Sequence, residues 1–90
     1  MLTLKTTGQF LRDYKLAKRR GLDLALLETV LDTLLAEKPL DEKYFDHALT
    51  GNYASFRECH LLPDWLLIYR VERDELVLIA ARTGTHSDLF

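Results

Sequence analysis

The sequence predicts an α+β fold in which two N-terminal helices pack on a small antiparallel sheet, in the order β-α-α-β-β-β. Two stretches with apolar side chains at helical spacing come first, and three apolar, strand-like stretches follow them. Only short turns separate those three stretches, and connections of that length join antiparallel neighbours. With 90 residues the chain has room for one core, so we expect residues 1–90 to form a single domain.

The N-terminal part is expected to contain one strand and one helix. Residues 2–5 form the strand, and the helix runs over residues 9–20, because apolar side chains recur there at i, i+4 and i+7. Either Thr6 or Thr7 caps the start of this helix, and Gly21 ends it.

The second helix begins after Asp23, a favourable N-cap residue. Its apolar positions form a face wide enough to contact both the first helix and the sheet. The helix ends before Pro39, because a residue that precedes proline disfavours the helical conformation. A polar loop over residues 37–46 and a turn at Gly51 then lead to the sheet.

The three C-terminal strands are expected at residues 53–61, 65–71 and 75–81. The second and third are apolar on both faces for most of their length, so both faces should be covered. The only cysteine, Cys59, falls in the first of these strands, where we expect a small buried side chain.

The composition is that of an ordinary globular protein, with 48% hydrophobic and 29% charged residues and a net charge of −2. No apolar run is long enough to cross a bilayer, and a single cysteine fits a reducing cytoplasm, so we expect a cytoplasmic protein. Basic side chains gather in residues 1–20 and acidic ones in residues 23–46. A basic helix face suits an anionic partner, and a solvated face would have the same pattern.

The strand order brings several chemically active residues to one rim of the sheet. The first C-terminal strand ends near His60, and the turn after it carries Asp64. The third strand ends at Arg82, and His86 follows in the tail. Because antiparallel strands alternate in direction, these residues should converge. His47 lies in the loop before the strands, and the topology does not decide whether it joins them.

These residue types suit cleavage of a phosphodiester by acid–base chemistry without a metal. Histidine can give or take a proton near neutral pH, and an adjacent carboxylate fixes its tautomer. Arg82 can brace a phosphate and stabilise charge in the transition state, while Phe90 or Trp65 can stack on a base. We therefore expect one group to remove the proton of a ribose 2′-OH and another to protonate the departing 5′-oxygen.

Each of these residues also has a structural interpretation. A histidine often makes only structural hydrogen bonds, Asp64 can be a turn residue, and Arg82 can pair with an acid. Trp65 opens an apolar strand and suits the core, and Phe90 can serve as a hydrophobic pin. Three histidines and an acid could also bind zinc, but their scatter lacks a recognised zinc-ligand spacing, so we expect no metal site and no cofactor.

Three separated blocks carry most of the candidate residues: His47-x-Leu49-x-Gly51, Arg57-Glu58-x-His60-x-x-Pro63-Asp64-Trp65-Leu66-Leu67-Ile68-Tyr69, and Arg82-Thr83-Gly84-Thr85-His86-Ser87-Asp88-Leu89-Phe90. In this order they resemble the YafQ-type toxins of the RelE/ParE superfamily of bacterial toxin–antitoxin systems. The resemblance covers essentially the whole chain, and it is poorest in the second helix and the loop after it.

The resemblance implies an endoribonuclease that enters the ribosomal A site and cuts mRNA there, with no small-molecule cofactor and no membrane. It assigns acid–base catalysis to His47, His60, Asp64 and His86. It assigns contacts with the phosphate and the RNA to Arg82 and Phe90. We expect His86 to act as acid or base nearest the scissile phosphate, with Asp64 and His60 working as a pair. A cognate antitoxin protein is implied as a partner.

Two other functions stay open from the sequence. One is that of a related superfamily toxin, which binds DNA gyrase and cleaves nothing. The other is that of an inactive relative, which serves only as a protein-interaction module. Three histidines near one rim argue against a pure binder, and the intact set of polar residues argues against an inactive module.

Overall fold

The elements follow the predicted order, with one short strand and one short helix in addition. A computed structural model describes all residues from 1 to 90. The elements are β1 (Thr3–Thr6), α1 (Gly8–Arg19), α2 (Leu24–Leu35), β2 (His47–Ala48), β3 (Arg57–Leu62), β4 (Trp65–Glu72), β5 (Val77–Gly84) and α3 (His86–Leu89). The sequence did not indicate β2 or α3.

The strands form one sheet in the order β1-β5-β4-β3-β2. β3, β4 and β5 form the predicted antiparallel meander, and β2 extends it in the antiparallel direction. β1 pairs with β5 in parallel, an arrangement that the long stretch of chain between the two strands permits. The α+β class and the element order are confirmed, and the antiparallel description holds for every pair except this one.

Two strands begin later than the sequence indicates. β3 begins at Arg57, because Gly51–Tyr53 form a 3₁₀ turn and Ser55 has a φ of 76°. β5 begins after Leu76, whose φ of 55° belongs to the preceding turn. Positive φ angles of this kind are incompatible with an extended strand. β5 also continues to Gly84, so that it includes Arg82.

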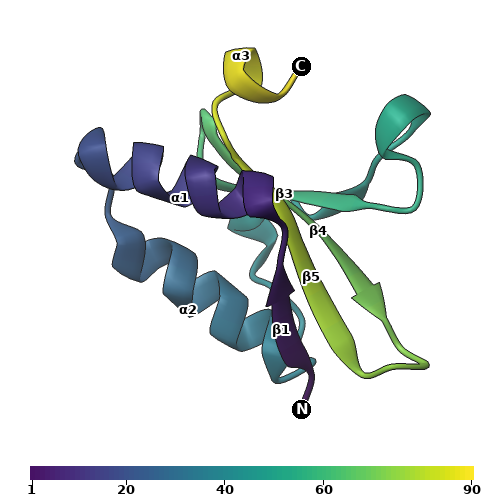
Figure 1. Cartoon of the computed structure of the whole chain (residues 1–90). Coiled ribbons are helices and arrows are strands. Elements are labelled where there is room, and N and C mark those ends of the chain that lie inside the picture. The colour runs from purple at the N-terminus through teal and green to yellow at the C-terminus, as the bar shows by residue number, and fades with distance from the viewer.

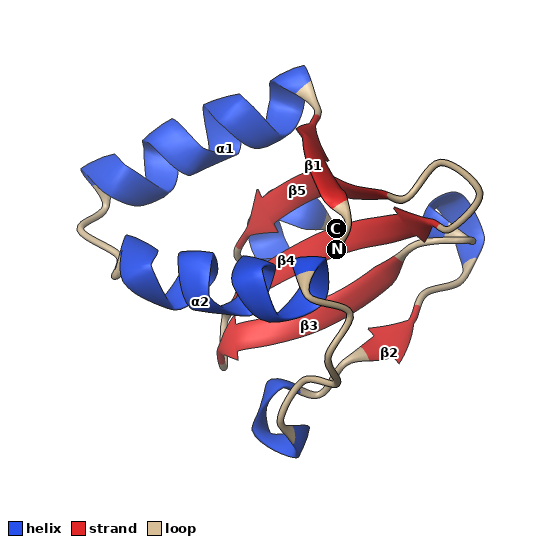
Figure 2. Ribbon diagram, turned by 90° about the horizontal axis from the view of Figure 1, so that it is seen from below, coloured by secondary structure: helices blue, strands red, loops and turns tan.

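The two faces of the sheet bury separate groups of side chains. α1 and α2 cover one face, and the main core lies between these helices and the sheet (Figure 1, Figure 2). On the opposite face Leu66, Ile68, Ala81 and Leu89 form a smaller cluster. β4 is therefore buried on both faces, as predicted. Cys59 is also fully buried, as predicted, and burial raises the pKa of its thiol to about 12.

The helix ends follow the capping rules. Thr7, and not Thr6, caps α1, since its side chain accepts a hydrogen bond from the Phe10 N–H. Asp23 caps α2 through the Ala25 N–H. Gly21 follows α1 with a φ of 77°, a conformation that favours glycine. None of the helices has the length and hydropathy to cross a lipid bilayer.

Candidate active site

Side-chain alternation places the candidate site on the sheet face away from α1 and α2. On β3, Cys59 and Leu61 belong to the main core, so Glu58 and His60 between and beside them face the opposite way. His47 on β2 lies directly opposite Glu58. The edge strand, absent from the sequence-based prediction, is therefore what brings His47 to the site.

The three histidines form a row across this face. The ring centres of His47 and His60 are 6.0 Å apart, and those of His60 and His86 are 5.7 Å apart. His60 lies in the middle, half-buried, with the exposed ring of Phe45 at 5.9 Å from it. The structure thus brings together His60 and His86, as the strand order predicts, and it adds His47, which the topology left undecided.

Asp64 binds the His86 end of the row. Its Oδ1 accepts the backbone N–H of His86 at 2.9 Å and lies 2.6 Å from the ring Nδ1 of the same residue. Both hydrogen bonds lower the pKa of Asp64, and the one from the backbone N–H has the larger effect. The prediction that Asp64 pairs with His60 is wrong. The start of α3 places His86 next to the β3–β4 turn, and His86 forms the hydrogen bonds with Asp64.

A second set of contacts fixes the helix that carries His86. Thr85 and Asp88 form a capping box at the start of α3. Arg20, just after α1, holds the same Asp88 through two hydrogen bonds of 2.7 and 3.3 Å. The Arg20 guanidinium and the Thr85 N–H keep the pKa of Asp88 well below its usual range. Leu89 is buried beneath, so the tail docks as predicted.

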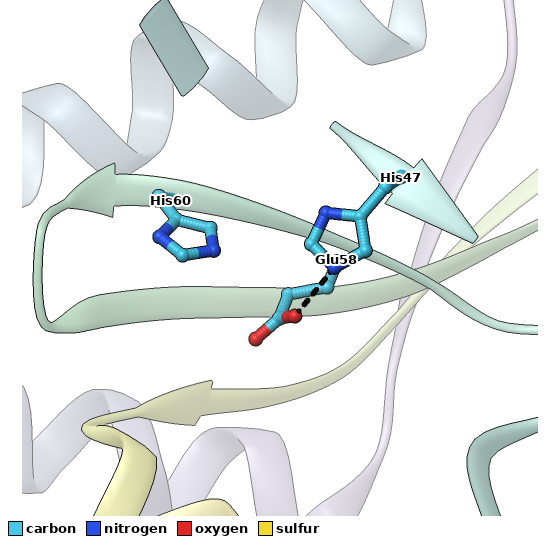
Figure 3. A group of neighbouring side chains, drawn as sticks. All are labelled: His47, Glu58 and His60. Carbon is cyan, nitrogen blue, oxygen red and sulfur yellow. Dashed lines mark ion pairs between the residues drawn. The ribbon is translucent and has the colours of Figure 1, made fainter. Parts of the chain in front are cut away.

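Glu58 binds the His47 end of the row. Its Oε2 lies 2.9 Å from the His47 Nε2, and the other ring nitrogen of His47 lies 2.6 Å from the Phe45 carbonyl oxygen. Figure 3 shows the Glu58 carboxylate directed to His47, with the ring of His60 beside it. Unlike Asp64, Glu58 is only 5% exposed. Glu58 was not among the predicted site residues, although its spacing of two residues from His60 places both side chains on one face.

Arg82 is held by an acid from the first helix. Its Nε donates to the Asp13 Oδ2 at 2.8 Å and its Nη2 to the Asp13 Oδ1 at 3.3 Å. Asp13 is buried and also accepts the Thr83 N–H. The pairing with Asp13 raises the pKa of Arg82. The arginine therefore has the structural partner that the sequence left open, while 24% of its side chain stays exposed.

The two aromatic candidates differ in their positions. Phe90 is 64% exposed and packs its ring against Tyr53 with centres 5.6 Å apart. Trp65 is 1% exposed and belongs to the main core beneath α1 and α2. The expectation that Trp65 stacks on RNA is therefore corrected, because side-chain alternation along β4 points it away from the site.

A groove of about 620 Å³ borders the row at His60. Its walls come from α2, the loop before β2 and the end of β3, and they include Tyr44, Phe45 and Leu62. Phe45 and Leu62 are exposed to 68% and 43%. The groove is lined mainly by apolar side chains.

Known proteins resemble the chain over its whole length. A family model described as bacterial toxin of type II toxin-antitoxin system, YafQ, matches residues 2–90. The mRNA interferase toxin YafQ of Escherichia coli K12 is 38% identical over 88 residues, which cover 97% of this chain and 94% of the relative.

Solved structures agree with this match. The crystal structure of a metal-bound toxin from Helicobacter pylori has a TM-score of 0.95 and 47% identity, with 100% of both chains covered. A chain of the E. coli DinJ–YafQ complex has a TM-score of 0.90 and 36% identity, covering 100% of this chain and 99% of that chain. The chain belongs to the YafQ family of toxins of bacterial type II toxin–antitoxin systems.

Proposed function

We propose that this chain is an endoribonuclease that enters the ribosomal A site and cuts mRNA by acid–base catalysis. The observation that carries this proposal is the row of three histidines with a carboxylate on each terminal ring. The name of the E. coli relative, an mRNA interferase, supports mRNA as the substrate. The cytoplasm, where ribosomes translate, is the proposed location.

The reaction needs two proton transfers and no metal ion. A base takes the proton from a ribose 2′-OH, the 2′-oxygen forms a bond to the adjacent phosphorus, and the bond from phosphorus to the 5′-oxygen breaks. An acid gives its proton to the departing 5′-oxygen. The products are a 2′,3′-cyclic phosphate and a 5′-hydroxyl. Two histidines in opposite protonation states can supply both transfers.

His86 is the proposed acid or base nearest the phosphate. We propose that the Asp64 carboxylate accepts the Nδ1–H of the ring, which fixes the orientation of the ring and leaves Nε2 available for proton transfer. His47, paired with Glu58, is the proposed second proton carrier. His60 lies between them, where its ring can donate to a non-bridging phosphate oxygen as charge develops in the transition state.

The surroundings of the row can hold RNA on both sides. The exposed part of Arg82 is the proposed phosphate contact, although Asp13 neutralises part of its charge. Phe90 offers an exposed ring on one side, and Phe45 offers another beside His60, so we propose Phe45 in place of Trp65 as a stacking surface. The basic side chains of α1 are exposed and suit ribosomal RNA or an acidic protein segment: Arg12, Lys15, Lys18 and Arg19.

The proposed protein partner is a cognate antitoxin. The E. coli relative forms a complex with DinJ, and we propose that an antitoxin of similar role binds this chain and blocks the site. We also propose that the capacity to bind metal, named for the H. pylori toxin, extends to this chain as a property separate from cleavage.

The proposal is tested by expression of the wild type and His86→Gln in a bacterial host. We expect the wild type to stop growth and to create new 5′-hydroxyl ends of mRNA within translated frames, while the variant does neither. If both proteins stop growth and no new ends appear, the chain acts by binding another target, such as DNA gyrase.

A further inference from the structure

The apolar groove beside His60 is continuous with the histidine row. His60 belongs to both, because its ring lies between those of His47 and His86 and also lines the groove. The volume of about 620 Å³ is in the range of pockets that hold small molecules. Apart from His60, the only residue with a charged side chain in the lining is Lys43, an exposed cation whose Nζ lies 5.2 Å from the ring centre of Tyr44. An apolar space with a cation beside it suits a flat ring that carries a phosphate.

Phe45 has an unusual position in this groove. Its ring is 68% exposed, and its backbone has φ 49° and ψ 47°, a left-handed conformation that is rare for a bulky residue. The turn is held by the Phe45 N–H, which donates to the Glu42 carbonyl oxygen at 3.1 Å, and by the Asp41 side chain, which caps the turn. An exposed ring on such a backbone adds little to the core. Residues of this kind gather at binding sites, where the conformation serves a ligand.

Phe45 also connects the groove with the catalytic row. Its carbonyl oxygen lies 2.6 Å from the Nδ1 of His47. Its ring meets the ring of His60 edge-on, with the centres 5.9 Å apart. A ligand that packs on the Phe45 ring would therefore fix the loop that orients His47, so that occupation of the groove and readiness of the row are coupled.

The outer edge of β3 offers hydrogen bonds along the groove. β2 pairs only with Arg57 and Glu58, so the backbone from His60 to Leu62 has no strand partner on that side. Free backbone N–H and C=O groups can pair with the edge of a nucleobase. The free stretch lies between β2 and the β3–β4 turn, and it is too short to pair with an added strand of another protein.

We propose that the groove binds one unstacked nucleobase of the RNA next to the scissile phosphate, and that Phe45 is the residue that stacks on it. The inference rests on the proposed function and names a subsite for its substrate. The stack gives affinity for any base, because every base has a flat face. The free edge of β3 then discriminates among bases by their hydrogen-bonding groups, and Lys43 is placed to contact the backbone phosphate of the same nucleotide.

Removal of the base and removal of the ring test this contact together. Single-turnover cleavage is measured on ribosomes that carry a defined mRNA, with an abasic nucleotide on the 5′ or the 3′ side of the cut. On one of these sides, loss of the base should slow the wild type by roughly 5–100-fold, the effect of losing one stacked base. Phe45→Asn should cut the intact mRNA more slowly by a similar factor and should respond little to the abasic nucleotide.

Two further variants separate the ring from the backbone. Asparagine tolerates the left-handed conformation, so Phe45→Asn keeps the turn and removes only the stacking surface, whereas Phe45→Trp should keep the response to the abasic nucleotide. Leu76→Asn is the matched control, because Leu76 is also apolar, 57% exposed and at a positive φ of 55°, but lies in the β4–β5 turn outside the groove. It should behave like the wild type. An equal abasic effect in the wild type and in Phe45→Asn would overturn the proposal.

A fluorescent base reports on the groove without cleavage. 2-Aminopurine, whose emission is quenched by stacking, replaces the base at the sensitive position, and His86→Gln prevents cutting. Quenching should occur with His86→Gln and be lost when Phe45→Asn is added. Absence of cleavage by the wild type would contradict the proposed nuclease, while quenching that depends on Phe45 would still support the groove. If Phe45→Asn weakens only the binding of the antitoxin and changes neither RNA response, the groove belongs to the antitoxin and the proposal is overturned.

Discussion

The two ends of the histidine row have the same pair of groups in different surroundings. At one end, Asp64 and His86 are both more than half exposed, at 63% and 54% of their side chains. At the other end, the Glu58 side chain is 7% exposed and His47 remains half in solvent. The Asp64 oxygen is satisfied by two hydrogen bonds from one residue, whereas one Glu58 oxygen is buried without a partner.

The difference in burial gives the two carboxylate–histidine pairs different electrostatic properties. An exposed pair can exchange protons with substrate and water at little cost, since solvent accommodates either charge state. A buried carboxylate instead exerts a strong, poorly screened field on its neighbours and favours a positive group beside it. At the exposed end both partners can therefore exchange protons with solvent, whereas at the buried end the carboxylate is shielded from water and only the imidazole of His47 is open to it.

Substitution of the exposed histidine should have the largest effect on activity. We expect His86→Gln to slow mRNA cleavage by about 10²–10⁴-fold, the range for loss of a general acid or base. The temperature of unfolding should stay near that of the wild type, because the ring is over half exposed. Primer extension on ribosome-bound mRNA gives the rate. A variant with more than half of the wild-type rate would remove His86 from the proposed chemistry.

Neutralising the carboxylate at either end should slow cleavage, but the two substitutions should differ in their effect on the stability of the protein. Asp64→Asn and Glu58→Gln should each lower the cleavage rate by about 10–100-fold, because each orients a histidine. Asp64→Asn should lower stability only slightly, since its carboxylate is exposed. Glu58→Gln should raise the free energy of unfolding by about 1 kcal/mol, because it removes a buried charge with an unpartnered oxygen. Urea denaturation of both variants makes the comparison, and equal effects on stability would contradict the distinction.

The sequence predicts the exposed end better than the buried one. The convergence of His60 and His86 follows from strand order, because the meander leaves little freedom once its strands are recognised. The position of Glu58 could have been predicted from the sequence, since side-chain alternation along β3 puts it on the same face as His60. It was missed because an acid two residues from a histidine in an apolar strand is also typical of an ordinary surface position.

Long-range pairs are what local patterns could not predict. The contacts of Arg20 with Asp88 and of Asp13 with Arg82 join α1 to β5 and the tail, across 68 and 69 residues of sequence. Nothing in the helix pattern distinguishes Arg20 from the basic residues before it. The two-residue strand β2 is equally invisible, because it is too short to have a periodic pattern of its own.

Loss of the Arg20 side chain should reduce the cleavage rate by less than loss of His86 does. Arg20 touches no part of the row, and it acts by holding Asp88 at the base of α3. We expect Arg20→Ala to lower kcat by about tenfold with little change in KM, because misplacing a catalytic group slows the chemical step. Arg20→Lys should restore only part of the rate, since a lysine cannot make the bidentate contact.

Lys18→Ala is the matched control for Arg20, because Lys18 is an exposed cation in the last turn of the same helix. We expect its kcat to equal that of the wild type, because loss of an RNA-attracting charge should appear in KM. Equal losses in the two variants would mean that Arg20 contributes through general attraction of RNA, and that the clamp on Asp88 is not needed to position His86.

At acidic pH, α3 should detach from the sheet while the sheet itself remains folded. This is the smallest effect that we predict. The pKa of Asp88 is depressed in the folded protein by Arg20 and by the Thr85 N–H, so its contribution is complete above the unfolded value of about 3.9. That contribution is lost as the pH falls from about 4 through the folded pKa. The pKa of Asp64 is shifted in the same direction. NMR signals of the α3 amides should therefore change below about pH 4 while those of β4, which is buried on both faces, remain. In the Asp88→Asn variant, the NMR signals of the α3 amides should already show at neutral pH the change that acid causes in the wild type. If α3 stays docked in this variant, Leu89 alone holds it in place.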